Sequence, residues 1–258
     1  MFMEERQQEI AKFIQRIGKI TVAEIKEKYG ISDESARRDL RLLEQQGVCK
    51  RTHGGAILPK PVGIRLPADR NFDEMPVFDN YREIARAAAG KIFENAAVYL
   101  PGGSFGHIML SFLPKDIHYT VIVNSVDMGK KLRDFDNIEV YIAGGKMRQS
   151  GSLVDSLANE FVSRMHFDIC FITGAGLTAE FGLSNGTEET AAFQRTVIKN
   201  SRKKYLLMPG TKIGTDSFIK VCESDDFDCV ITDWDCTEEQ ISAIKENGTE
   251  VIIVEAPK

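Results

Sequence analysis

The sequence predicts an N-terminal winged helix-turn-helix domain followed by a C-terminal α/β domain with a mainly parallel sheet. Helical periodicity dominates residues 1–47, and two β-prone runs follow up to residue 58. After residue 80, short apolar runs alternate with helical segments, as in parallel sheets covered on both faces. With 258 residues, of which 43% are hydrophobic, the chain is long enough for two ordinary domains.

The first domain is expected to hold three helices and a hairpin. Apolar residues recur at helical spacing in three groups: Ile10, Phe13, Ile14 and Ile17; Val22, Ile25 and Tyr29; and Ala36, Leu40 and Leu43. Glycines that would end these helices follow each group: Gly18, Gly30 and Gly47. Thr21, with Glu24 in capping-box position, and Ser32 are the expected helix caps. The runs 48–51 and 55–58 then predict a hairpin.

A proline-rich segment separates this domain from the rest of the chain. Four of the eight prolines lie at positions 59, 61, 67 and 76, without helical or strand periodicity. We therefore expect a winged helix-turn-helix domain over 1–57, a linker over 58–80 and a second domain over 81–258.

The second domain should contain seven strands of a doubly covered sheet. The predicted strands are 97–100, 120–124, 139–144, 168–174, 204–210, 229–233 and 250–255. The clearest helical patterns between them are 81–93, 190–200 and 237–247. Ligands of such sheets bind beyond the carboxyl ends of the strands.

Charge and composition narrow the class of protein. The net charge is −5, yet residues 1–60 carry 12 Lys and Arg against 9 Asp and Glu, while the remainder carries 21 against 29. No apolar run reaches the roughly 18–20 residues of a membrane helix, and the charged N-terminus does not resemble a signal peptide. Five cysteines without a CxxC pair favour reduced thiols. We expect a cytoplasmic protein without membrane contact, metal or cofactor.

The third helix is the expected DNA reader. Arg37 and Arg41 share a face opposite its apolar residues, Arg38 lies beside them, and Ser35 lies in the first turn. Such side chains donate to phosphates and base edges. The candidate DNA-binding residues are Ser32, Ser35, Arg37, Arg38, Arg41, Lys50, Arg51, Thr52, His53, Gly54 and Gly55. The alternative is a solvated helix face on which these arginines pair with Asp39 and Glu44.

The segment SDESARRDLRLLEQQGVCKRTHGGAIL, residues 32–58, closely resembles the DNA-binding signature of the deoxyribonucleoside-repressor (DeoR) family of bacterial transcription factors. The RRDL and RTHGGA pieces carry most of this resemblance. It implies a second domain that resembles ribose-5-phosphate isomerases and senses an effector. Retained family features are Asn124, Ser125 and Asp127, Gly144 and Gly145, residues 151–154, Gly174 to Gly176, Glu189 and Lys212.

The effector site is expected where glycine-rich loops follow the strands. Their backbone amides suit an anion, and Lys212 would add a charge for a phosphate. The alternative is that the glycines only permit tight turns. The candidate effector-binding residues are Gly102, Gly103, Ser104, Phe105, Asn124, Ser125, Gly144, Gly145, Gly174, Gly176, Glu189 and Lys212.

Three departures from the family pattern bear on the effector. The usual Asp-Ser-Gly-Thr-Thr run is Pro-Gly-Gly-Ser-Phe at 101–105, a usual Asp is Pro209, and a usual Lys is Gln194. The resemblance therefore implies a less charged site, with Phe105 as an apolar wall, and an effector outside the usual range.

We expect a repressor of a metabolic operon that binds double-stranded operator DNA as a homodimer or homotetramer, controlled by a sugar phosphate or a related metabolite. Two alternatives stay open. One is an isomerase-like enzyme with Glu189, or less favourably Asp127, as base and a regulatory DNA-binding domain. The other is a DNA-binding scaffold without a ligand. No catalytic residue is assigned, because the lost carboxylates and the attached DNA-binding domain argue against catalysis.

Overall fold

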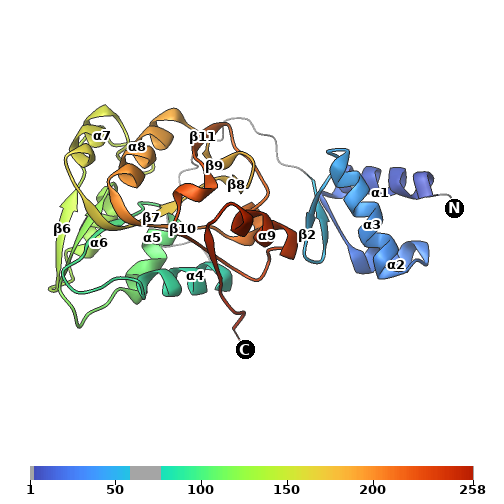
Figure 1. Cartoon of the computed structure of the whole chain (residues 1–258), viewed down its shortest axis with the longest axis horizontal. Coiled ribbons are helices and arrows are strands. Elements are labelled where there is room, and N and C mark those ends of the chain that lie inside the picture. Colours follow the sequence, from blue (N-terminus) through green and yellow to red (C-terminus); the bar gives the residue numbers. More distant parts are fainter. Residues whose placement is uncertain (1–2, 59–76, 258) are drawn as a thin grey trace. The chain divides into compact units, whose positions relative to one another are not determined.

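The computed structural model describes residues 3–58 and 77–257. The chain divides into two compact units, Met1–Pro61 and Val62–Lys258, which we call the head and the body (Figure 1). Most of the expected linker, residues 59–76, lies outside the described residues. The body's first helix begins at Asp79, two residues earlier than predicted.

The described part of the head is a helix-turn-helix with a small antiparallel sheet. Its helices are α1 (Met3–Ile17), α2 (Val22–Tyr29) and α3 (Asp33–Gln45). Its strands are β1 (Lys19–Thr21), β2 (Lys50–Thr52) and β3 (Gly55–Ile57), in the order β1-β3-β2. The predicted hairpin is β2–β3. Strand β1 was not predicted, because three residues between two helices carry no strand period.

Local signals place the ends of these helices as predicted. The Thr21 hydroxyl accepts from the Glu24 backbone N–H at 3.1 Å, and the Glu24 carboxylate accepts from the Thr21 N–H at 2.7 Å, which completes the capping box. Gly30 ends α2 in the left-handed region at φ 63°, where glycine is favoured. Ser32 caps α3 by accepting from the Ser35 N–H. The predicted inner face of α3 is buried.

The described body is built on a 7-stranded parallel sheet in the order β13-β12-β10-β7-β4-β5-β6. Its strands are β4 (Ala97–Leu100), β5 (Tyr119–Val123), β6 (Ile138–Ile142), β7 (Phe167–Thr173), β10 (Ser201–Leu207), β12 (Cys229–Thr232) and β13 (Glu250–Ile253). Each predicted strand is present within a few residues. The chain runs outward from β4 to β6 and then returns to the other side of β4, so the strand order reverses between β4 and β7. Crevices at such reversals bind ligands in open α/β sheets.

Helices cover both faces of this sheet. The described helices are α4 (Asp79–Ala89), α5 (Ser104–Met109), α6 (Val126–Leu132), α7 (Ser156–Ser163), α8 (Glu188–Lys199) and α9 (Glu238–Glu246). Short 3-10 turns occupy Leu110–Phe112, Gly210–Lys212 and Ser224–Asp226. None of the described helices is both long and apolar enough to cross a membrane.

A second antiparallel sheet follows the end of β7. It contains β8 (Gly176–Thr178), β9 (Gly182–Asn185) and β11 (Ile219–Cys222), in the order β11-β9-β8. The sequence did not predict it, because these strands are short and two of them begin with glycine. Gly176 and Gly182 are both buried against backbone of neighbouring segments.

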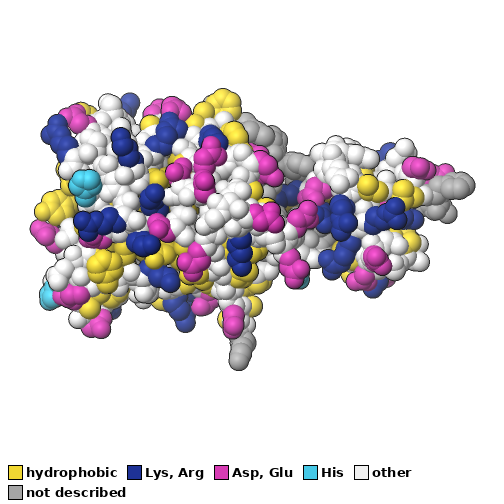
Figure 2. Space-filling view, viewed as in Figure 1, with side chains coloured by type: hydrophobic (Ala, Val, Ile, Leu, Met, Phe, Trp, Pro, Cys, Tyr) yellow, Lys and Arg dark blue, Asp and Glu magenta, His cyan; other side chains and the backbone are white. Residues whose placement is uncertain are grey.

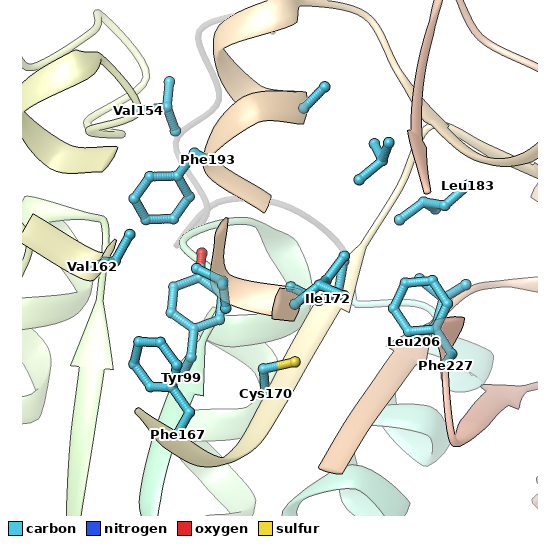
Figure 3. Packing of buried hydrophobic residues seen from close by; sticks show 14 of the residues in the cluster. Tyr99, Val154, Val162, Phe167, Cys170, Ile172, Leu183, Phe193, Leu206 and Phe227 are labelled. Atoms are coloured by element: carbon cyan, nitrogen blue, oxygen red, sulfur yellow. The ribbon is translucent and has the colours of Figure 1, made fainter. Parts of the chain in front are cut away.

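Alternate residues of the large sheet enter two separate hydrophobic clusters. Tyr99, Cys170 and Leu206 face α7 and α8, where Phe193 and Val162 complete one cluster (Figure 3). The neighbouring strand residues face α4, α5 and α6 in the other cluster. Burial of both strand faces explains why these strands appear as continuous apolar runs in the sequence.

Candidate functional sites

The exposed face of α3 carries three arginines without the carboxylate partners that the alternative required. Arg37, Arg38 and Arg41 are exposed. The Arg37 guanidinium donates to the His53 carbonyl at 3.5 Å, which links α3 to the turn of the hairpin. Within 3–58 and 77–257, no hydrogen bond or ion pair is found for Arg38 or Arg41. Figure 2 shows Lys and Arg side chains gathered on the head.

The two carboxylates near these arginines are bound elsewhere. Asp39 is buried and accepts from Arg6 Nε at 2.6 Å and from Gln7 Nε2 at 3.0 Å, which ties α3 to α1. Glu44 accepts from the backbone N–H and Nε of Arg51, at 2.7 and 2.5 Å. The cationic face of α3 is therefore not neutralised by Asp39 or Glu44.

The hairpin, or wing, contains residues of different character. Lys50, Arg51 and Thr52 are half-buried on β2, while His53 and Gly54 are exposed at the turn. Gly55 is buried, and a Cβ there would lie 2.1 Å from the Ile20 carbonyl oxygen. Close packing against β1 thus explains this glycine without DNA. Contact of the eleven candidate residues with DNA stays a prediction.

The loops after β4 and β5 meet at the carboxyl edge of the sheet. A Cβ at Gly102 would lie 2.8 Å from Ser125 Cβ and 3.1 Å from Asn124 Oδ1, so only glycine fits there. Asn124 is buried, accepting from the Tyr99 hydroxyl at 3.0 Å and donating to the Leu153 carbonyl at 3.2 Å. Ser125 caps α6. Asn124 and Ser125 thus hold the loops of this edge together.

A hydrogen-bonded network surrounds the end of β7. Lys212 Nζ donates to the Gly174 carbonyl at 3.1 Å. The preceding carbonyl, of Thr173, accepts from Gln194 Nε2 at 2.8 Å, and Gln194 Oε1 accepts from Asn185 at 2.5 Å. Gln194 stands at the position where the family resemblance implies a lysine. It is buried and hydrogen-bonds to both Thr173 and Asn185.

Glu189 lies at the start of α8 and pairs with an arginine that sequence reasoning missed. Arg148 Nη2 donates to Glu189 at 3.1 Å, and its Nη1 donates to the Thr190 hydroxyl at 3.2 Å. Arg148 follows Gly144 and Gly145 in the loop after β6. A cation in a loop at the carboxyl end of a strand was the signal by which the sequence could have identified it as a candidate site residue. Gly145 has φ 140° and packs against Asp155, so its conformation explains the glycine.

Phe105 requires a correction. Its side chain is only 3% exposed and stacks on Tyr81 of α4, with ring centroids 4.7 Å apart. The ring belongs to the core between α4 and α5, so the expectation that it forms a wall of the effector site is not supported. Gly103 and Ser104, just before it, are half-buried at the start of α5.

Burial disfavours ionisation of two groups in the core of the body. Burial raises the pKa of the Tyr99 hydroxyl well above its usual range and that of the Cys170 thiol to about 12. Among the described residues, no group of three or more His, Cys, Asp or Glu side chains is placed to hold a metal ion.

A helix-turn-helix with a cationic reading helix, joined to an α/β body with a polar carboxyl edge, defines a DNA-binding transcription regulator with a sensor domain. Two family models match the chain: the DeoR-like helix-turn-helix domain over residues 6–62 and the DeoR C-terminal sensor domain over 79–234. The protein belongs to the DeoR family of transcriptional regulators, which confirms the resemblance seen in residues 32–58.

Curated relatives match along nearly the whole chain. The HTH-type transcriptional repressor GlcR of Bacillus subtilis is 30% identical, with 99% of this chain and 98% of the relative covered. The HTH-type transcriptional regulator GlpR of Haloferax volcanii is 28% identical, with 98% of each covered. A lactose phosphotransferase system repressor of Staphylococcus aureus is 28% identical, with 93% of this chain and 96% of the relative covered.

Among solved structures, the chain is similar to a ribose 5-phosphate isomerase A of Methanocaldococcus jannaschii, with a TM-score of 0.38 and 13% identity. The match covers 51% of this chain, which spans about half, 52%, of the isomerase chain.

Proposed function

We propose that this protein represses a metabolic operon by binding paired operator half-sites through α3 and the wing, and that a phosphorylated sugar or related metabolite controls it. The observation that carries the DNA-binding part is the exposed row of Arg37, Arg38 and Arg41, with Asp39 and Glu44 engaged elsewhere. Exposed arginines on a recognition helix suit phosphates and guanine edges. The names of the relatives, among them a lactose phosphotransferase system repressor, support a link to sugar metabolism.

The test of DNA binding is substitution of single arginines in the full chain. Arg37→Ala and Arg38→Ala should each weaken operator binding by about 1–3 kcal/mol if the residue reads a base. A phosphate contact would instead weaken binding to all sequences and flatten the salt dependence. Arg133→Ala, an exposed body arginine, is the matched control for loss of one charge. Unchanged binding in both α3 variants would contradict the docking.

The effector is proposed to bind at the carboxyl edge near the β4–β7 reversal. Two cations hydrogen-bond to candidate residues there: Lys212 donates to the Gly174 carbonyl, and Arg148, in the loop after β6, donates to Glu189 at the start of α8. Two carboxylates and one ammonium that the family resemblance implies are replaced by Pro101, Pro209 and Gln194, which favours a less hydroxylated ligand than usual. The relevant screen measures melting temperature of the full chain with phosphorylated and unphosphorylated sugars and polyols.

Effector binding is proposed to reach the head through the start of α4, the first body helix after the linker. Tyr81 stacks on Phe105 of α5, and Asn80 Nδ2 donates to buried Asp233 at 2.9 Å. Asp233 also accepts from the Gly210 N–H at 3.2 Å, close in sequence to Lys212. Loops of the proposed effector site thus contact residues adjacent to the linker. By linkage, operator and effector must change each other's affinity by the same factor; equal effector affinity with and without operator would contradict this.

We further propose that the protein is a cytoplasmic homodimer or homotetramer and not an enzyme. Glu189, the carboxylate suspected as a base, is engaged by Arg148, which suits a structural pairing better than proton abstraction. Turnover of aldose and ketose phosphates that is lost in Glu189→Gln would instead favour the isomerase-like alternative.

A further inference from the structure

Strand β6 is an edge of the large sheet and is surrounded by exposed apolar side chains. It lies at the end of the body farthest from α9 in Figure 1. Large hydrophobic residues are exposed on β6 and on the segments beside it: Val126, Tyr141, Ile142, Met147 and Leu157. Figure 2 shows hydrophobic side chains reaching the surface at this end of the body. Open edges with apolar surroundings are ready to pair with another strand.

The backbone of β6 presents its central residues outward. The Ala143 N–H donates to the Val123 carbonyl of β5 at 2.8 Å, so odd-numbered residues of this strand turn their N–H groups toward β5. Successive residues alternate, and Val140 and Ile142 therefore direct their backbone groups away from the sheet. Within the described residues, no strand pairs with this side of β6.

The sequence of β6, Ile-Glu-Val-Tyr-Ile, is complementary to itself when reversed. In an antiparallel pair centred on Val140, Val140 exchanges hydrogen bonds with Val140 of a second copy. Glu139 then faces Tyr141 of that copy in a non-hydrogen-bonded pair, where side chains are closest. Ile138 faces Ile142. Within one chain the Tyr141 hydroxyl already donates to Glu139 Oε1 at 3.2 Å, so both groups lie on one face and match chemically.

The opposite edge, β13, lacks this complementarity. The segment 250–255, which contains β13, reads Glu-Val-Ile-Ile-Val-Glu, and both glutamates are exposed. The Val254 N–H donates to Thr232 of β12, so Val251 and Ile253 direct their backbone groups outward. Antiparallel pairing centred on Val251 would place Glu250 against Ile252 of the second copy, and pairing centred on Ile253 would place Glu255 against Val251, so a glutamate faces an apolar residue in either register.

We infer that β6 forms the contact between two copies of this chain, by antiparallel pairing across a two-fold axis that joins two seven-stranded sheets into one. Sheets of that size occur in large α/β proteins, and a self-complementary strand gives an isologous interface. The inference rests on the proposed function in that two heads on paired half-sites require a two-fold assembly.

The test compares charge variants at Tyr141 in the full chain by sedimentation equilibrium. Tyr141→Glu places two carboxylates opposite each other twice per dimer, and should raise the dimer dissociation constant about tenfold. Tyr141→Lys removes the same ring but faces Glu139, and should stay within about threefold of the wild type. Equal weakening by both substitutions would contradict the proposed register.

A second pair of variants blocks the two edges in turn. Val140→Pro removes an outward N–H without losing a bond to β5, and should abolish pairing while circular dichroism stays unchanged. Ile253→Pro does the same on β13, since the Val254 N–H points to β12, and should leave association unchanged. A monomeric wild type, or wild-type association in Val140→Pro, would overturn the inference. A wild-type tetramer that Val140→Pro reduces to a dimer would support it.

DNA binding is measured separately on the same variants. Loss of operator binding in Arg37→Ala with the assembly intact would leave the proposed β6 interface unaffected. An assembly that Val140→Pro leaves at its wild-type size would refute the interface without bearing on the proposed function.

Discussion

The head and the body differ in whether the polar side chains of their candidate sites are bound within the protein. On α3, Asp39 is bound to α1 and Glu44 to the wing, and the arginines face outward. At the carboxyl edge of the body sheet, Asn124, Gln194 and Lys212 already bond to the protein itself.

The difference matches the two kinds of partner. DNA is a polyanion, so unpaired cations on a rigid helix bind it with little reorganisation. A small ligand at the body edge must replace internal hydrogen bonds with its own, because buried polar groups left unpaired are costly. If the effector binds at this edge as proposed, its binding exchanges internal hydrogen bonds for bonds to the ligand, and we expect the loops that carry these bonds to move. The substitutions below test this comparison.

The largest effect is expected where an acid of the head is removed from its structural partners. Asp39→Ala leaves the half-buried Arg6 guanidinium without its carboxylate and should destabilise the head by about 3–5 kcal/mol. Hydrogen exchange of α1 and α3 amides measures this. Asp33→Ala breaks an exposed ion pair with Lys26 and should cost less than about 1 kcal/mol. Similar losses for both would mean that Asp39 has no special structural role.

Adjacent glycines at the wing should differ in their tolerance to substitution. Gly55→Ala forces a methyl group against the Ile20 carbonyl and should cost about 1–3 kcal/mol. Gly54→Ala meets nothing within 4 Å and should stay within about 0.5 kcal/mol. Thermal unfolding gives the change in stability of each variant, and a DNA-binding assay on the same variants gives the change in affinity. If Gly54→Ala weakens DNA binding without lowering stability, the backbone at Gly54 approaches the DNA closely.

At the body edge, the buried amide of Gln194 should matter for stability before any ligand is added. Gln194→Met keeps the side-chain size but leaves Asn185 and the Thr173 carbonyl without their partner, which should cost about 1–3 kcal/mol. Urea unfolding followed by Trp234 fluorescence gives the change. An unchanged urea midpoint would show that the hydrogen bonds of Gln194 to Asn185 and to the Thr173 carbonyl do not contribute to stability.

The smallest effect concerns the capping box of α2. Hydrogen bonds from the Thr21 backbone and side chain lower the pKa of Glu24 below its ordinary value of 4.5. Its stabilisation is therefore fully present above pH 4.5 and is lost as pH falls through the lower folded pKa. Glu24→Gln should be slightly less stable than the wild type at pH 7, and the difference should vanish in acid. A stability difference between Glu24→Gln and the wild type that persists at low pH would argue that the negative charge of Glu24 is not its cause.

The predictions that held depend on neighbours in sequence. Thr21 and Ser32 each accept a hydrogen bond from the backbone N–H three residues ahead. The parallel strands are continuous apolar runs, which can be recognised without knowing which strands lie beside them. Phe105 was misjudged because a ring after a glycine-rich loop fits a pocket or a core equally well, and its stacking on Tyr81, far away in the chain, decided between them. Arg148 was missed because its partners on α8 lie some forty residues away.

The sequence by itself determined the two domains, the helix-turn-helix with its cationic helix, and the strand–helix alternation of the body, because spacing and capping act within a few residues. Only the tertiary structure decided which polar groups are free. Contacts between distant segments decide that Asp39 is buried against Arg6 while Arg38 is exposed. Such contacts also let Gln194 hydrogen-bond to both Asn185 and Thr173. Hydrogen bonds of this kind form only once the chain has packed.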